Sequence, residues 1–156
     1  MPAVMQDGGK MGIKIFNGSV EHGVRYIIII YDEKGGELLC MMDAAYLTGA
    51  RTGATTGIAT RYQARKDAKS VGIIGSGLEA RTNFEAVCSV RNIESAAVFS
   101  PNPKNRERFA SEVSDRLGLE VHAALGVALH VEPVCVCVGV YEGVLCEVGV
   151  CEVACQ

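Results

Sequence analysis

The chain has 156 residues, of which 49% are hydrophobic and 21% charged, and its formal net charge is −3. These values are ordinary for a globular protein, and the negative charge argues against a nucleic-acid or anionic-membrane partner. Residues 1–12 lack the order of a signal peptide. No apolar run approaches the roughly 20 residues of a membrane span. We therefore expect a soluble, cytoplasmic protein.

The first 65 residues predict β-strands followed by one helix. Apolar runs indicate strands at residues 13–16, 24–31 and 37–42, the last two joined by a glycine-rich turn over 32–36. Asp43 is placed to cap a helix over 44–65, because its carboxylate can accept from backbone N–H groups of the first turn.

Small residues recur every four positions in this expected helix. Gly49, Gly53 and Gly57 repeat in this way, and so do threonines at 48, 52, 56 and 60. A repeat of four lies on one side of a helix. Each glycine costs about 0.8–1.0 kcal/mol of helix propensity relative to alanine. We therefore expect close packing or ligand contact on that side to offset the cost.

A different pattern follows the charged connector 65–70, which is a candidate domain boundary. The sequence predicts a strand at 70–74, a helix to 91, a strand at 96–99, a helix from Pro103 capped by Asn102, and a strand at 119–123. Alternation of this kind is typical of the first half of a doubly wound sheet. The predicted fold class is α/β: a partial substrate and dimerisation domain (1–65), half of a Rossmann domain (66–123) and a tail (124–156).

The string VGIIGSGLEA, residues 71–80, carries a dinucleotide-binding pattern. Gly75 permits a tight turn, Gly77 lets a pyrophosphate approach the backbone, and Ala80 lets the helix pack close to the strand. A diphosphate would rest on N–H groups at the helix N-terminus, and the expected cofactor-binding residues are Gly75, Ser76, Gly77, Leu78 and Glu79. A tight turn without a ligand is the alternative, which the preceding strand and following helix disfavour.

The end of the second strand bears on which ribose is bound. NAD-binding proteins usually place Asp or Glu about 20 residues after the loop, and residues 99–104 contain neither. Ser100, Asn102 and Lys104 could instead donate to a 2′-phosphate, which favours NADP. The alternative is that Asn102 only caps a helix and Lys104 is solvated.

Two stretches together resemble the ornithine cyclodeaminase/mu-crystallin family, which includes alanine dehydrogenases and ketimine reductases. The first runs from GIKI (12–15) through a hairpin to LTGARTGATTGIATRYQAR (47–65), and the second is SVGIIGSGLEARTNFEAV (70–87). The resemblance covers residues 1–123. It implies an NAD(P)-dependent homodimer that acts on a small amino or imino acid through hydride transfer at the α carbon.

The resemblance also implies roles for three residues. Lys14 is expected to be the catalytic lysine, Arg51 to bind the substrate carboxylate, and Thr52 to contact a cofactor phosphate. The residue types fit, because arginine offers a planar fork to a carboxylate and a buried lysine can move protons near neutral pH. The pattern alone would predict a solvated lysine and a helix-surface arginine. Family members often carry arginine where this chain has Pro101, which argues against NADP.

Compared with the family, the chain lacks the second Rossmann half, the family's catalytic aspartate and the C-terminal segment that completes the first domain. We therefore expect a fragment. Two alternatives to an enzyme stay open at this point. One is a mu-crystallin-like protein that binds NADPH and a small ligand, and the other is an inactive truncated product.

The tail is rich in Val, Cys, Gly and Glu from residue 134 onward. Its five-residue repeat matches neither the helical nor the strand period, although the alternation over 134–140 could form one strand. The cysteines do not have the paired spacing of zinc sites, so we assign no metal to Cys135, Cys137, Cys146, Cys151 and Cys155. The remaining two, Cys40 and Cys88, are interpreted as buried thiols.

Overall fold

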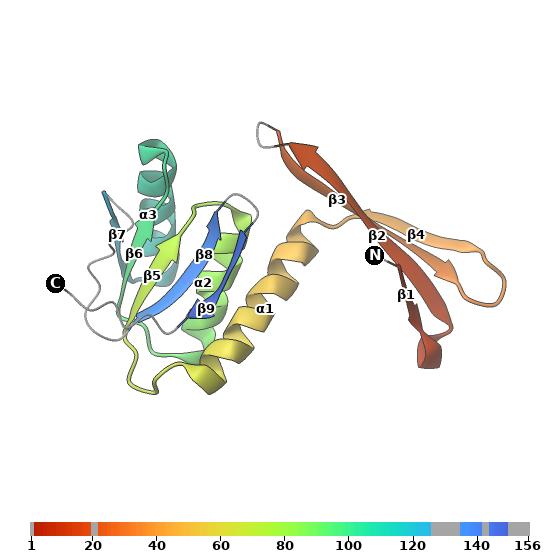
Figure 1. The fold of residues 1–156 in the computed structure, drawn as a ribbon, viewed down its shortest axis with the longest axis horizontal. Helices are drawn as coiled ribbons and strands as arrows, with labels where there is room; N and C mark the ends of the chain where they lie inside the picture. Colours follow the sequence, from red (N-terminus) through yellow and green to blue (C-terminus); the bar gives the residue numbers. More distant parts are fainter. Residues whose placement is uncertain (1, 20–21, 126–134, 142–143, 150–156) are drawn as a thin grey trace. The chain divides into compact units, whose positions relative to one another are not determined.

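The computed structural model describes residues 2–19, 22–125, 135–141 and 144–149. They form an α/β structure with two compact units, Met1–Thr48 and Gly49–Gln156. Each unit contains one β-sheet, and Figure 1 shows both sheets with the helices of the chain. Among the described residues, no helix is long and apolar enough to cross a membrane.

The first unit is an antiparallel sheet with the strand order β1-β2-β3-β4. Its elements are β1 (Pro2–Met5), the short 3₁₀ helix η1 (Gln6–Gly8), β2 (Lys10–Ser19), β3 (Gly23–Asp32) and β4 (Leu38–Asp43). The three strands expected from the sequence are present, and β2 is longer than expected. The sequence did not predict β1, because residues 1–12 show no apolar period; the strand forms by pairing with β2.

The turn between β3 and β4 follows from Asp32. Its Oδ2 accepts hydrogen bonds from the backbone N–H groups of Lys34 and Gly35, at 3.1 and 2.6 Å. Gly36 then takes a left-handed conformation with a φ of 69°, which glycine adopts without steric cost. The glycine-rich turn predicted over residues 32–36 is therefore confirmed.

Helix α1 (Ala45–Gln63) begins at the expected cap, since Asp43 Oδ1 accepts from the N–H of Ala45 at 3.0 Å. From Gly49 onward the helix packs on α2 (Leu78–Val90). A Cβ added at Gly53 would lie 2.5 Å from the Thr82 carbonyl oxygen. The predicted close approach of the glycine side is therefore confirmed. The connector 65–70 lies inside the second unit, because this packing joins α1 to the elements that follow it.

The second unit has a sheet with the order β7-β6-β5-β8-β9. Strands β5 (Ser70–Ile74), β6 (Ser95–Phe99) and β7 (Glu120–Ala123) are parallel, and they are connected through α2 and α3 (Pro103–Leu117). This is the predicted first half of a doubly wound sheet. The core between the strands and these helices contains fully buried side chains of Val71, Ile73, Phe84, Val87, Val98, Phe109 and Val113.

Two further strands extend this sheet. Strand β8 (Cys135–Tyr141) pairs in parallel with β5, and β9 (Val144–Gly149) pairs antiparallel with β8. The alternation over 134–140 predicted one strand, and β8 corresponds to it. The five-residue repeat was not expected to form a strand, but pairing with β8 uses backbone hydrogen bonds, which require no side-chain period. The interpretation of 124–156 as a low-complexity tail stays a prediction.

The cysteines divide into two groups. Cys40 and Cys88 carry free thiols and are half-buried, so they are less buried than the sequence suggested. Cys88 lies at the margin of the core, where burial is the main cause that raises the pKa of its thiol to about 11. The side chains of the five tail cysteines lie outside the described residues. Within the described part of the chain, no three His, Cys, Asp or Glu residues are grouped as metal ligands.

Candidate cofactor and substrate residues

The turn after β5 has the conformation that the glycine pattern predicted. Gly75 has a φ of 108°, which L-residues with a side chain rarely adopt. Its N–H donates to the Phe99 carbonyl at 2.7 Å. The chain therefore reverses at the carboxyl ends of β5 and β6, where ligands bind in open parallel sheets of this kind.

Helix α2 starts directly after this turn with an open N-terminus. Its N-cap residue is Gly77, which has no side chain to cap the helix. Among the described residues, no atom lies within 4 Å of a Cβ added at Gly77. The first N–H groups of an α-helix have no carbonyl acceptor within their own helix. They also carry the positive end of the helix dipole. The backbone from Gly75 to Glu79 thus fits a diphosphate group.

Ser76 and Ser100 connect the loop to the end of β6. Ser76 Oγ donates to Ser100 Oγ at 3.0 Å, and Ser100 is buried. Asn102 caps α3, because its Oδ1 accepts from the N–H of Lys104 at 3.0 Å. The predicted cap is therefore confirmed, and a contact of the Asn102 amide nitrogen with the cofactor stays a prediction.

Sequence reasoning did not single out Arg106, which also lies at this end of the sheet. Its Nη1 donates to the Ser100 carbonyl at 3.1 Å, and the residue is half-buried. The available signal was its position four residues after the cap Asn102, which places it on the first turns of α3 beside the end of β6.

The expected substrate residues belong to different units. Lys14 lies on β2 opposite Ile28 in the first unit, and its Nζ is 4.6 Å from the centre of the Tyr26 ring. Lys14 is half-buried. Arg51 and Thr52 lie on α1 in the second unit; Arg51 is exposed and Thr52 is half-buried.

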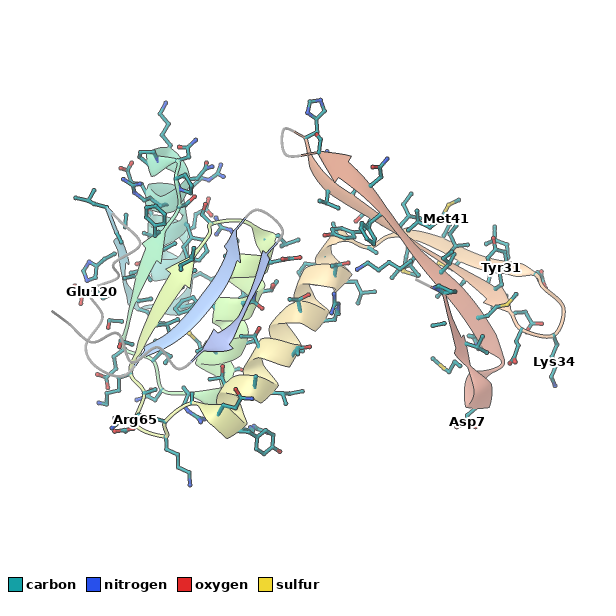
Figure 2. All side chains as sticks on the ribbon, viewed as in Figure 1. Asp7, Tyr31, Lys34, Met41, Arg65 and Glu120 are labelled. Atoms are coloured by element: carbon teal, nitrogen blue, oxygen red, sulfur yellow. The ribbon has the colours of Figure 1, made fainter. Side chains whose placement is uncertain are left out.

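Arg91 is a further residue that the sequence did not identify. Its guanidinium donates to the carbonyl oxygens of Thr60, Arg61 and Ala64 in or just after the last turn of α1, at 2.9, 3.0 and 2.8 Å. Nε also donates to the Arg65 carbonyl at 3.0 Å; Figure 2 labels Arg65 beside the end of α1. These bonds fix the end of α1 to the end of α2.

The model of the ornithine cyclodeaminase/mu-crystallin family matches residues 1–142. The chain belongs to this family. The match extends beyond residue 123, where the sequence resemblance ended, and it includes β8. A curated relative, the Δ¹-pyrroline-2-carboxylate reductase of Bacillus cereus, is 32% identical over 124 residues, covering 76% of this chain and 38% of the relative.

Two solved structures of family members are also similar. The Δ¹-pyrroline-2-carboxylate reductase of Thermococcus litoralis, in complex with NADH and L-proline, has a TM-score of 0.80 and 38% identity; the match covers 89% of this chain and 46% of the other. An archaeal alanine dehydrogenase dimer with bound NAD has a TM-score of 0.69 and 33% identity, covering 80% and 40%. The chain thus spans less than half the length of these relatives, which include NAD-binding oxidoreductases of amino acid metabolism.

Proposed function

We propose that this chain contributes the nicotinamide-dinucleotide site and part of the substrate site of an oxidoreductase or cyclodeaminase for small amino or imino acids. The observation that carries the proposal is the phosphate loop. It combines a glycine turn at the end of β5, open space at Gly77 and an uncapped α2 N-terminus. The complexes of two relatives with NADH and NAD support this assignment.

The backbone of Gly75, Ser76, Gly77, Leu78 and Glu79 would hold the diphosphate. Ser100 would line the adenosine end of the site through its position after β6. Thr52 on α1 is proposed as a further phosphate contact. When bound, a nicotinamide dinucleotide supplies a carrier that exchanges hydride with the substrate α carbon.

The chain's own side chains have simple roles in this proposal. Arg51, exposed on α1, offers two parallel N–H donors to a substrate carboxylate and orients the α carbon. Lys14 would hold or deliver a proton at the substrate nitrogen, and the nearby Tyr26 ring restrains its ammonium. The same residues would serve an imine reductase, an amino-acid dehydrogenase or a cyclodeaminase.

We also propose that two copies associate through the first unit. Its small sheet leaves large apolar side chains exposed at Met5, Ile15, Phe16, Leu38 and Met41, the last of which Figure 2 labels on β4. Exposed apolar surface of this kind is typical of an interface. The alanine dehydrogenase relative is a dimer. Light scattering of the wild-type chain should show a dimer. Met41→Glu should weaken this dimer, and Lys34→Glu, in the exposed turn, should leave it intact. A wild-type monomer would contradict the proposal.

The cofactor assignment is tested by Gly77→Val in the full 156-residue chain. Gly77 has a φ of −83°, which valine can adopt, and an added Cβ lies within 4 Å of no atom of the described residues. The variant should therefore fold normally but block an approaching diphosphate. Fluorescence titration with NADH and NADPH should show affinity reduced at least about tenfold, equivalent to about 1.4 kcal/mol. Unchanged binding, with an unchanged thermal midpoint, would contradict the site.

Turnover separates the enzyme from a binding protein. The full chain is incubated with pyrroline-2-carboxylate, alanine or lysine and the appropriate nicotinamide cofactor, and absorbance of the reduced nicotinamide is followed. In an active form of the protein, Lys14→Ala should chiefly lower kcat, and Arg51→Ala should chiefly raise KM. Cofactor binding without any turnover would favour the ligand-binding alternative.

A further inference from the structure

The segment that follows β6, from Ser100 to Arg106, carries positive charge and no negative charge. Between Phe99 and Arg106 the charged residues are Lys104 and Arg106. This end of the strand is joined to the phosphate loop by the bond between Gly75 N–H and the Phe99 carbonyl and by the bond between Ser76 and Ser100. In dinucleotide sites of this class, the residues after the second strand meet the adenosine ribose.

The N-terminus of α3 does not offer backbone donors to a ligand here. Pro103 has no N–H, and the N–H of Lys104 donates to the Asn102 side chain. The N–H groups of Asn105 and Arg106 both donate to the Asn102 carbonyl, at 3.1 and 3.2 Å. The first turn of α3 is therefore satisfied internally, in contrast to that of α2. An anion at this position would have to be bound by side chains.

Arg106 is the side chain best placed for that task. Its bond to the Ser100 carbonyl fixes the guanidinium against the strand end while the residue stays partly accessible. A guanidinium has five N–H donors, and within the described part of the chain one of them is engaged and no carboxylate pairs with it. Lys104 is exposed and carries a more mobile charge.

We infer that Arg106 binds the 2′-phosphate of the adenosine ribose and makes the chain selective for NADP(H) over NAD(H). This inference rests on the proposed cofactor site. Two of the relatives described above were solved with NADH and NAD.

The test compares Arg106→Gln with Arg108→Gln in the full chain. Arg108 is a matched control because it lies on the same helix, has a side chain 65% exposed and is 3.9 Å from Glu112. Each variant is titrated with NADPH, NADH and adenosine 2′,5′-bisphosphate by fluorescence or calorimetry. Wild-type protein should bind NADPH at least about tenfold more tightly than NADH. Arg106→Gln should lose about 10- to 100-fold in NADPH affinity, the worth of one charge-assisted contact, and change NADH affinity less than about threefold.

A second variant at the same position separates a lost phosphate contact from a folding defect. Arg106→Lys keeps the charge without the fork and should give intermediate NADPH affinity with unchanged stability, which excludes a folding defect as the cause. Tighter binding of NADH than of NADPH by the wild type would overturn the inference but leave the proposed function intact. Loss of NADPH affinity in Lys104→Gln and not in Arg106→Gln would overturn it too. If the wild type binds neither cofactor, the proposed function itself has failed.

Discussion

Thr56 on α1 donates a hydrogen bond to Asn83 on α2, with 2.9 Å between Thr56 Oγ1 and Asn83 Oδ1, and both residues are buried. This bond lies on the side of α1 that carries the glycines, where the two helix backbones approach each other. Helix α2 begins at the phosphate loop, so the contact fixes α1 against the element that would bind the cofactor.

Replacing Thr56 with valine should destabilise the chain by about 1–3 kcal/mol, because Asn83 would be left buried with an unsatisfied acceptor. Thr60 gives a matched control on the same helix. Its Oγ1 is buried without a hydrogen-bond partner among the described residues, so Thr60→Val should be neutral or stabilising. Urea unfolding of the three proteins measures the difference, and equal losses in both variants would contradict the interpretation.

The glycines of α1 should differ in their tolerance of alanine. At Gly53 a Cβ would lie 2.5 Å from the Thr82 carbonyl oxygen, which is backbone and cannot move without shifting α2. At Gly49 the nearest atom is the Leu78 side chain at 3.2 Å, which can adjust. We expect Gly53→Ala to cost about 1–3 kcal/mol of unfolding free energy despite its better helix propensity. Gly49→Ala should be close to neutral, and the reverse order would show that the helices are not packed through Gly53.

These positions also show how far the sequence determines the fold. The four-residue glycine repeat predicted a close helix contact, and the caps at Asp43 and Asn102 were predicted because capping is local chemistry. Strand β1 could not be predicted in this way, because it depends on pairing with β2 rather than on its own period. Arg91 and Arg106 were missed for the same reason: their acceptors lie on other elements or loops, and the folded chain brings them together.

Arg91 should contribute more to stability than an ordinary surface arginine. It donates to three carbonyl oxygens at the end of α1, where the helix itself supplies few donors. The Thr60 carbonyl also accepts from the N–H of Ala64 at 3.1 Å. Arg91→Ala should therefore cost about 1–3 kcal/mol and increase hydrogen exchange in the last turn of α1. Arg116→Ala is the control, because its ion pair with Glu85 is exposed and is worth less than about 1 kcal/mol. Equal effects of the two changes would contradict the anchoring role.

The raised pKa of Cys88 predicts a loss of stability at alkaline pH. Burial first, and the negative charge of Glu85 second, raise the pKa of the thiol from 9.0 to about 11. Over this interval the folded chain keeps a proton that the unfolded chain has lost, so the free energy of unfolding falls as the pH rises from about 9 to 11. Cys88→Ala removes this titration and should show a shallower fall than wild type, whatever its stability at neutral pH. Ser89→Ala, the exposed neighbouring position, should keep the wild-type slope. Parallel curves for wild type and Cys88→Ala in urea unfolding across this range would show that the thiol is not protected by the fold.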